Sequence, residues 1–550
     1  MFKLAVVLLS RFICEGEERP RSSYWRLVRL HPSSSKVMES LKNIPEFFAG
    51  RSVLITGGTG FMGKVLVEKL LRSCSDIETI YLLIRPKKGQ EVQERLQDLI
   101  SLTIFDEVRR RNGLLGKIIP IQGDITQPKL GLSLDDQNLL RSKVSVIFHA
   151  AATVKFDEAL KKSVAINMSA TKSIIDLALN MSKLEALIHV STAYCNCNRL
   201  ENEEQIYPVN YAPEQVLTAA QTLDSELLDV LTPKLLDGRP NTYTLTKALA
   251  EQIVNEQNGI LPIAIIRPSI VTAAWKEPIP GWVDNMNGPT GIFVGACKGI
   301  LRSLYCDSDC IADLVPVDAA INLCIAVAWH TAVYRPHNIP VYNCTTGTCN
   351  PIYWGDIEKW FHYYLYAYPS ADVFWYPDGS FKKHQLMHKL AVTLFQRCPA
   401  YLFDFFSIIC GREPMMVRIQ DKILKATSTL EFFTVRNFRF KNDNMMTLWK
   451  SMLKEDKNIF NFELTSINWA SYIEIYVLGI RKYILKEDPK TIPIARQKIM
   501  RMYILHMVSQ ATVVAIFCWL LLKRSTSTRK KLIETVNICF SLMKKFKKLT

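Results

Sequence analysis

The chain has 550 residues, which is enough for two or three domains with substantial hydrophobic cores. Apolar residues make up 48% and charged residues 22%, a balance that excludes a disordered chain. The net charge is +16, but much of the excess lies in the last thirty residues. This distribution excludes a chain-wide nucleic-acid interface and indicates contact with an anionic membrane surface. The 14 cysteines lack paired zinc-site spacing, so we expect reduced thiols and no metal.

Residues 1–43 are predicted to be an extension ahead of an ordered domain that begins near Ile44. Residues 2–10 imitate the start of a signal peptide, but no small-residue cleavage site follows and charged residues come soon after. We interpret the segment as nonessential, which an alternative start upstream of Met38 would explain.

Apolar runs alternate with helical stretches from Val53 to about Val271, which is typical of βαβ units. This rhythm predicts an α/β fold, a Rossmann-type doubly wound parallel sheet within a reductase domain at 44–350. Residues 276–350 are rich in Gly, Pro and Asn and are predicted to be loops over a substrate cleft. Dense aromatic residues at 351–490 indicate a smaller, mostly helical C-terminal domain. The expected strands are 52–56, 79–84, 117–121, 144–149, 186–191 and 262–267.

A glycine-rich run follows the first expected strand and leads into a segment with helical periodicity. It reads Thr56-Gly57-Gly58-Thr59-Gly60-Phe61-Met62-Gly63, and its glycines fit Gly58-x-Gly60-x-x-Gly63 or Gly57-x-x-Gly60-x-x-Gly63. A strand, a glycine turn and a helix N-terminus form a pyrophosphate cradle, because the backbone comes close and offers free N–H groups. We predict a dinucleotide site here; the alternative is a tight turn that needs positive φ.

Arg85 follows the second expected strand, where a cofactor with a free ribose 2′-OH is usually held by an acidic residue. A guanidinium can instead grip a 2′-phosphate through two parallel hydrogen bonds. We therefore predict NADP(H) rather than NAD(H), with a solvated basic loop as the alternative. Asp124, after the third strand, is placed to accept a hydrogen bond from the adenine amino group or to cap the next turn.

Tyr243 and Lys247 form a Tyr-x-x-x-Lys pair at the start of a helical run. Their i,i+4 spacing puts both side chains on one helix face. A neighbouring ammonium favours the phenolate and lowers the pKa of a tyrosine from about 10, so that the hydroxyl can exchange protons. A surface pair is the alternative when this spacing stands alone, but the glycine motif upstream favours a catalytic pair.

Ser191 and Thr192 follow the fifth expected strand, at the edge where open α/β sheets bind their ligands. A hydroxyl there can hydrogen-bond a substrate carbonyl oxygen beside the tyrosine. The sequence does not decide between the two residues, although we favour Thr192. His189 is interpreted as a strand residue and not as a catalyst.

Two further segments are apolar. Residues 390–411 contain Arg397 and Asp404, charges that are expensive at mid-bilayer, so an interfacial or buried helix is expected there. Residues 502–522 have the length that a bilayer requires and are predicted to be a transmembrane helix, followed by a basic tail at 523–550.

The orientation of this span conflicts with the charge of the tail. The tail holds nine Lys/Arg against one Glu, which favours a cytosolic tail, yet a domain that uses NADPH must also face the cytosol. Either the charge rule fails here, or 390–411 or the amphipathic 532–543 forms a hairpin with the span.

The motifs together resemble the extended short-chain dehydrogenase/reductases and, more narrowly, the alcohol-forming fatty acyl-CoA reductases. The resemblance covers about residues 40–490. It is carried by the glycine run and by His149-Ala150-Ala151-Ala152-Thr153-Val154-x-Phe156-Asp157, His189-Val190-Ser191-Thr192-Ala193-Tyr194, Tyr243-x-x-x-Lys247, Ile266-Arg267-Pro268-Ser269-Ile270-Val271 and Tyr476-Val477-Leu478-Gly479-Ile480-Arg481-Lys482-Tyr483.

The resemblance implies that NADPH reduces a long-chain acyl-CoA through a bound aldehyde to a primary alcohol. Its implied catalytic residues are Tyr243, Lys247, Thr192 and Ser191. It also implies a membrane protein of the endoplasmic reticulum or peroxisome, with the catalytic domain facing the cytosol. The implied cofactor-binding residues are Thr56, Gly57, Gly58, Gly60, Phe61, Gly63, Arg85, Asp124, Ala150, Tyr243, Lys247 and Pro268.

Two alternatives remain open at this point. One is another membrane-bound extended reductase, for instance a sterol-type dehydrogenase, and the other is a non-catalytic NADP-sensing scaffold. The proton donor speaks against the scaffold, because a binding-only protein has no need of it. No nucleic-acid partner is expected, and the oligomeric state is open.

Overall fold

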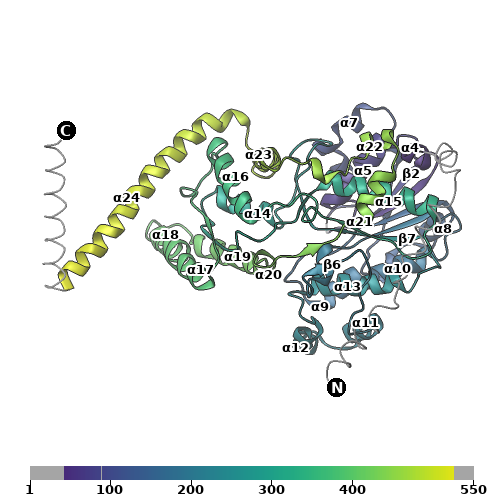
Figure 1. Cartoon of the computed structure of the whole chain (residues 1–550), viewed down its shortest axis with the longest axis horizontal. Helices are drawn as coiled ribbons and strands as arrows, with labels where there is room; N and C mark the ends of the chain where they lie inside the picture. Colours follow the sequence, from purple (N-terminus) through teal and green to yellow (C-terminus); the bar gives the residue numbers. More distant parts are fainter. Residues whose placement is uncertain (1–42, 88, 525–550) are drawn as a thin grey trace, which may run out of the picture.

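The computed structural model describes residues 43–87 and 89–524 (Figure 1). The first helix, α4 (Ile44–Phe48), begins after Asn43, whose side chain accepts a hydrogen bond from the Glu46 amide. Predictions for residues 1–42 and for the tail at 525–550 lie outside the described residues.

Seven parallel strands form the central sheet, in the order β11-β7-β5-β4-β1-β2-β3. This doubly wound order confirms the predicted Rossmann-type fold, and its switch point lies between β1 and β4. The six expected strands are all present with ends within one residue of the prediction. The strands are β1 (Ser52–Thr56), β2 (Thr79–Ile84), β3 (Ile118–Gln122), β4 (Val144–His149), β5 (Ala186–Val190), β7 (Ile263–Pro268) and β11 (Val341–Cys344).

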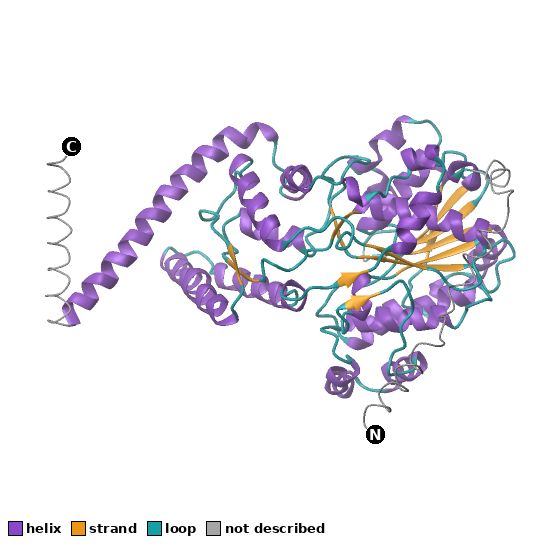
Figure 2. Ribbon diagram, viewed as in Figure 1, coloured by secondary structure: helices purple, strands orange, loops and turns teal. Residues whose placement is uncertain are grey.

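Helices cover both faces of the sheet, as Figure 2 shows. On one face α5 (Phe61–Ser73) packs with α15 (Val317–Tyr334), and on the other α10 (Ala170–Ala178) packs with α13 (Thr242–Asn255). Each face therefore has its own apolar core. The remaining helices of this part are α6 (Val92–Ile100), α7 (Asp106–Arg110), α8 (Leu134–Lys143), α9 (Leu160–Val164), α11 (Pro213–Thr222) and α12 (Ser225–Leu235).

The prediction of loops over 276–350 is wrong for about half of that range. It contains α15, which is mostly buried, and the edge strand β11. A helix that is apolar all round has no amphipathic periodicity, so the sequence pattern did not reveal it. The range also holds α14 (Pro289–Cys297), β9 (Ser303–Tyr305) and β10 (Leu314–Pro316), the last paired with β8 (Ile270–Thr272).

The C-terminal region is mostly helical, as predicted, and it is pinned to the sheet domain. The Tyr472 hydroxyl lies 2.6 Å from the Thr272 hydroxyl, and two short strand pairs, β12–β9 and β13–β6, cross between the regions. Its elements are α16 (Trp354–Ala367), α17 (Gln385–Val392), α18 (Cys398–Ile409), α19 (Met416–Ser428), α20 (Glu431–Thr434), α21 (Asp443–Ser451), α22 (Lys454–Ile459), α23 (Trp469–Gly479) and α24 (Ile492–Arg524), with β12 (Ser380–Lys382), β13 (Arg439–Phe440) and β6 (Glu201–Asn202).

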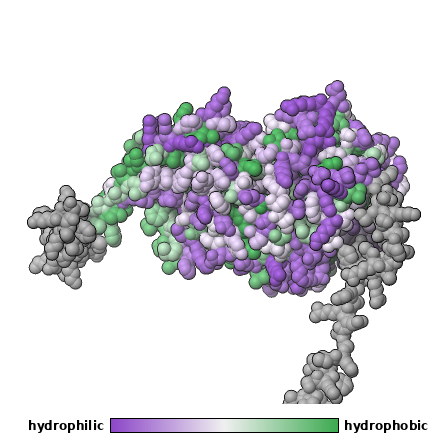
Figure 3. Space-filling model, turned by 45° about the horizontal axis from the view of Figure 1, so that its top comes forward, coloured by the Kyte–Doolittle hydropathy of each residue, from purple (hydrophilic) through white to green (hydrophobic). Residues whose placement is uncertain are grey.

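Helix α24 leaves the body of the molecule and contains the predicted transmembrane segment 502–522 (Figure 1). Within the described residues, two helices are long and apolar enough to cross a membrane: the mostly buried α15 and Pro489–Leu520, which is only 6% buried. The space-filling view shows hydrophobic residues gathered along this arm and at the adjoining end of the molecule (Figure 3). An exposed apolar helix of this length is a candidate membrane anchor.

Candidate active site

The predicted site residues come together at the carboxyl edge of the sheet. Thr56, Ala150, Ser191 and Pro268 follow or end β1, β4, β5 and β7, which are neighbours in the sheet. Parallel strands end at the same edge, and the switch point between β1 and β4 opens a crevice there.

The glycine run forms a tight turn from β1 into α5. Gly57 has φ +77°, and a Cβ added to it would lie 2.7 Å from the Ala151 amide nitrogen. A Cβ on Gly63 would collide with the Gly57 carbonyl oxygen. Gly60 is the N-cap of α5 and provides no side-chain cap, so the first amides of the helix keep their N–H groups for a ligand. The turn thus has the form of a phosphate cradle.

Two predicted cofactor residues of this turn have side chains that contact protein. Thr56 is fully buried, and its hydroxyl lies 2.8 Å from His149 Nδ1. The half-buried Phe61 ring stacks on Trp282, with ring centroids 5.5 Å apart. These side chains hold the turn in place, so any contact of these two residues with the nucleotide would come from their backbone atoms.

Arg85 and Asp124 lie side by side beyond β2 and β3. Arg85 Nη1 is 3.8 Å from Asp124 Oδ2, and the Arg85 side chain is 58% exposed. The other Asp124 oxygen accepts hydrogen bonds from the Thr126 amide and hydroxyl, so Asp124 does cap its own turn. An exposed ion pair of this kind contributes little to stability, so the Arg85 side chain can leave Asp124 and bind a phosphate at little cost in free energy.

Tyr243 and Thr192 meet at the start of α13. The Thr192 side chain lies close enough to Tyr243 to lower the pKa of its phenol, and the Thr192 hydroxyl donates to the Pro268 carbonyl at 3.4 Å. The Ser191 hydroxyl is buried without a hydrogen-bond partner among the described residues. The geometry therefore favours Thr192 as the hydroxyl that acts beside the tyrosine, and leaves Ser191 as an orphaned polar group.

Lys247 lies one turn after Tyr243 and is buried. Its Nζ donates a 2.7 Å hydrogen bond to the Val190 carbonyl at the end of β5. Burial lowers the pKa of this amine to about 8, opposed by the nearby Glu251 carboxylate. Burial likewise raises the pKa of Tyr243 to about 12, which the nearby Thr192 side chain partly offsets.

The raised tyrosine pKa differs from the expected lowering. Desolvation of the phenolate is the largest influence on the pKa of Tyr243, while the Lys247 amine donates its hydrogen bond to a backbone carbonyl. A neutral Tyr243 is the form that can donate a proton.

Aromatic residues from two regions cover Tyr243, a feature that sequence reasoning missed. Phe156 stacks on Tyr243 with ring centroids 5.7 Å apart, and the ring of Phe433, in α20, lies 5.5 Å from that of Phe156. Lys425 also pairs with Asp157 at 2.9 Å. The C-terminal region thus packs on the residue that stacks on the tyrosine. Phe156 and Phe433 are 277 positions apart in the chain, so no local pattern reveals their contact.

A buried histidine pair adjoins the lysine. His149 and His189 lie with ring centroids 5.5 Å apart, and burial beside Lys247 lowers the pKa of His149 to about 3. Both are neutral and sit inside the sheet, which agrees with the interpretation of His189 as a strand residue.

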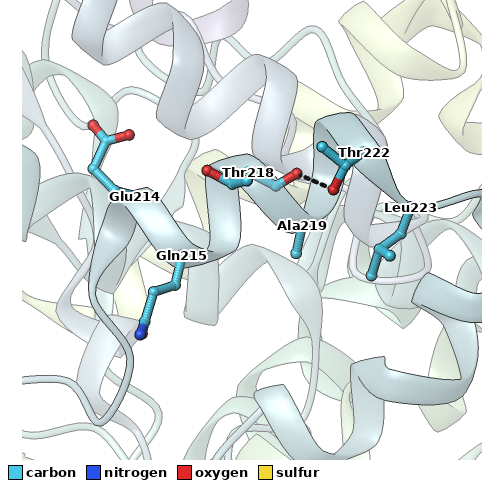
Figure 4. Close-up of a pocket in the computed structure, with 6 residues that line it drawn as sticks. All are labelled: Glu214, Gln215, Thr218, Ala219, Thr222 and Leu223. Atoms are coloured by element: carbon cyan, nitrogen blue, oxygen red, sulfur yellow. Dashed lines mark hydrogen bonds between the residues drawn. The ribbon is translucent and has the colours of Figure 1, made fainter.

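A shallow hollow elsewhere on the surface is not a candidate site (Figure 4). Its lining comes from one stretch of chain in and just after α11, from Glu214 to Leu223, and Thr222 merely donates to the Thr218 carbonyl. It lacks the convergent polar groups that a binding site needs.

The sequence matches known families over most of its length. Two family models, both described as "Male sterility protein" and the first an NAD-binding model, match residues 55–324 and 395–487. Fatty acyl-CoA reductase 1 of Xenopus laevis is 40% identical over 506 residues, covering 92% of this chain and 98% of the relative. The Homo sapiens enzyme of the same name is 40% identical over 507 residues, and fatty acyl-CoA reductase 2 of Bos taurus is 40% identical over 505.

Solved structures agree on the fold. The terminal R domain of the myxalamid pathway has a TM-score of 0.54 at 20% identity, covering 79% of this chain and 91% of that one. The reductase domain of a nonribosomal peptide synthetase from Mycobacterium tuberculosis has a TM-score of 0.54 at 19% identity, covering 80% and 93%. With the doubly wound sheet, the glycine turn and full-length relatives in agreement, the chain belongs to the fatty acyl-CoA reductase family.

Proposed function

We propose that this protein reduces long-chain fatty acyl-CoA to a primary fatty alcohol and CoA, using NADPH and a bound aldehyde. The observation that carries the proposal is the meeting of Tyr243, Thr192 and Lys247 at the same sheet edge as the glycine turn. Family membership favours an acyl-CoA substrate over a sterol.

The glycine turn fits a dinucleotide phosphate. Gly57 packs closely on the Ala151 backbone and Gly63 on the Gly57 carbonyl, where any Cβ would collide, and this close packing gives the turn its shape. The start of α5 has no side-chain cap, so its first N–H groups can bind phosphate oxygens. Arg85, exposed just after β2, would hold a ribose 2′-phosphate, which favours NADPH over NADH. The reaction needs two hydrides, and two NADPH molecules bound one after the other would each supply one.

The residues of this chain supply the proton and the stabilising hydrogen bonds. In the first half-reaction the Tyr243 and Thr192 hydroxyls donate hydrogen bonds to the thioester carbonyl oxygen as negative charge develops on it. Tyr243 gives that oxygen its proton, which yields a hemithioacetal that releases CoA. In the second half-reaction the same pair receives the aldehyde oxygen, and Tyr243 protonates the resulting alkoxide.

Lys247 positions this pair and can restore the proton. Its amine is fixed on the Val190 carbonyl, one helical turn from the phenol. Phe156 and Phe433 exclude water from the same place, which keeps the reactive aldehyde from solvent.

The low water solubility of the substrate and product explains why the enzyme would carry the exposed apolar helix α24. Each CH2 group moved out of water is worth about 0.8 kcal/mol, so a long-chain alcohol stays in lipid. We propose that α24 and the basic tail hold the enzyme on the membrane of the endoplasmic reticulum or peroxisome, with the catalytic domain in the cytosol, where NADPH is present.

Product analysis tests this function. Purified full chain in lipid vesicles, given palmitoyl-CoA or stearoyl-CoA and NADPH, is expected to form the matching primary alcohol, identified by gas chromatography. Turnover of a sterol without alcohol formation would support the dehydrogenase alternative. NADPH binding without any turnover would support the scaffold.

A further inference from the structure

The helix that runs through α17 and α18 buries polar side chains and exposes apolar ones. Gln385–Val392 continues through a single wide turn, Thr393–Arg397, into Cys398–Ile409, giving about 25 residues or roughly 37 Å of helix. Its buried stripe recurs every four residues and includes the polar side chains of His388, Gln396 and Asp404.

The buried polar side chains are fully engaged with the protein. Gln396 accepts hydrogen bonds from the Arg302 and Ser303 amides at 2.8 and 2.9 Å, and His388 Nδ1 lies 2.8 Å from the Ser303 hydroxyl. Asp404 accepts from three successive amides, Met415 to Val417, at the start of α19. The helix is therefore held along its length on the C-terminal domain by its polar side, which excludes a membrane crossing of its own.

The outward face is apolar. Large hydrophobic side chains there are 48–69% exposed, which is the reverse of a water-facing helix. The expectation of a buried helix at 390–411 is thus wrong, and the interfacial alternative remains. The exposed side chains are Leu386, Met387, Leu390, Leu394, Phe395, Tyr401, Leu402, Phe403, Phe405, Phe406, Ile408 and Ile409.

The charge around this face suits an anionic lipid surface. Between residues 382 and 425 there are eight Lys/Arg and three Asp/Glu, and Asp404 is turned inward. Lys389 and Arg397 are exposed on the helix itself, where long basic side chains can reach headgroups while their stems lie among apolar groups.

The length of α24 points to the same surface. His506 is held on the C-terminal domain by a 3.2 Å hydrogen bond from Trp375 Nε1, and Tyr376 packs on both His506 and Tyr503. Only about 16 residues then remain to Leu522, or roughly 24 Å, against a hydrocarbon core of about 30 Å. A span is complete only if this aromatic anchor lies within the membrane interface, where Trp and Tyr are favoured.

The two features share one end of the molecule. Helices α17 and α18 and the outer part of α24 lie at the same end of its long axis, away from the sheet (Figure 1). We propose that the α17–α18 face lies in the membrane interface and, together with α24, fixes the C-terminal domain against the lipid. The proposal rests on the membrane attachment proposed above for α24.

Probe depth in the bilayer tests the proposal. Full chain with Cys14, Cys398, Cys410, Cys518 and Cys539 changed to Ser is labelled with a nitroxide and reconstituted in phosphatidylcholine–phosphatidylserine vesicles. The label is attached at Phe405→Cys or, as the matched control on α19, at Lys422→Cys. We expect the probe at 405 to collide more with oxygen than with a water-soluble nickel chelate, and the probe at 422 to show the opposite preference. Unchanged thermal unfolding in detergent checks that both variants fold.

Other outcomes overturn the proposal. Equal chelate access at both positions, in protein that resists carbonate extraction, would leave α24 as an anchor and place the α17–α18 face in water. Shielding from both reagents, together with dimers in detergent, would assign the face to a second copy of the chain. Loss of carbonate resistance would instead contradict the attachment by α24, and alcohol production reports separately on the proposed reaction.

Discussion

At the carboxyl edge of the sheet, polar side chains gather around a place shaped for a ligand, whereas along α17–α18 they point back into the protein and leave apolar groups outside. Ser191 illustrates the first region, because its buried hydroxyl has no partner among the described residues. Asp404 illustrates the second, because three backbone amides satisfy it fully. At the ligand edge of a parallel sheet, a buried hydroxyl without a partner is available to a ligand, while satisfied polar groups behind an apolar face leave that face without polar contacts of its own.

The largest effect is expected at the tyrosine. Tyr243→Phe removes the proton donor, so alcohol formation should fall by about 10³-fold or more while the NADPH dissociation constant changes less than twofold. Tyr211→Phe is the control and should keep full activity, because this partly buried tyrosine of the same domain donates its hydroxyl only to the Lys234 carbonyl, away from the site. Substantial turnover by Tyr243→Phe would show that the assigned acid is wrong.

The glycine turn should be nearly as sensitive. Gly57→Ala adds a Cβ 2.7 Å from a backbone nitrogen, so NADPH affinity should drop by at least about 100-fold in a fluorescence titration. Gly113→Ala is the matched control, since Gly113 has φ +83° but nothing within 4 Å of its added Cβ. Similar losses in both variants would mean that positive φ alone, and not the cradle, explains the effect.

Arg85 should set cofactor choice. Arg85→Ala is expected to raise the KM for NADPH by about 10- to 100-fold and to leave the KM for NADH unchanged, because only NADPH carries the 2′-phosphate. Arg110→Ala, at another exposed arginine, is the control. Parallel changes for both cofactors would remove Arg85 from phosphate recognition.

Lys247 predicts a pH dependence. Its lowered pKa of about 8 means that the amine is charged below that pH and loses its proton as the pH rises through it. If the charge assists Tyr243, kcat/KM should decline above about pH 8. Lys247→Arg stays charged and should abolish the decline, at some cost in rate. An alkaline limb that persists in Lys247→Arg would assign the titration to another group.

The smallest expected effect is on thermal stability, from a change in the α17–α18 region. Asp404→Ala leaves the start of α19 without its cap, so thermal unfolding in detergent should shift down by a few degrees while NADPH affinity stays the same. A change in NADPH affinity would show that the two regions are not independent.

The sequence predicted what depends on local pattern. The strand runs, the glycine turn and the Tyr243/Lys247 spacing rest on short-range periodicity, and six strands lie within one residue of the prediction. It missed α15, which is apolar all round, and β11, the edge strand that follows it. The packing of Phe433 on Phe156 could not be foreseen, because that contact depends on how two distant regions pack.

The fate of 390–411 shows the same limit. Its composition allowed a buried or an interfacial helix, and only the three-dimensional structure shows that Gln396 and Asp404 point inward. A helix that buries its polar side and a helix that buries its apolar side have the same hydrophobic periodicity in sequence. Which side is buried depends on the part of the protein against which the helix packs.

The central claim is that one site, with one phenol, carries out both reductions. Wild-type protein in vesicles should therefore convert palmitoyl-CoA and NADPH deuterated at the transferred C4 position into hexadecanol with two deuterium atoms on C1, measured by mass spectrometry. Aldehyde carrying a single deuterium as the final product, or alcohol without deuterium, would contradict the claim.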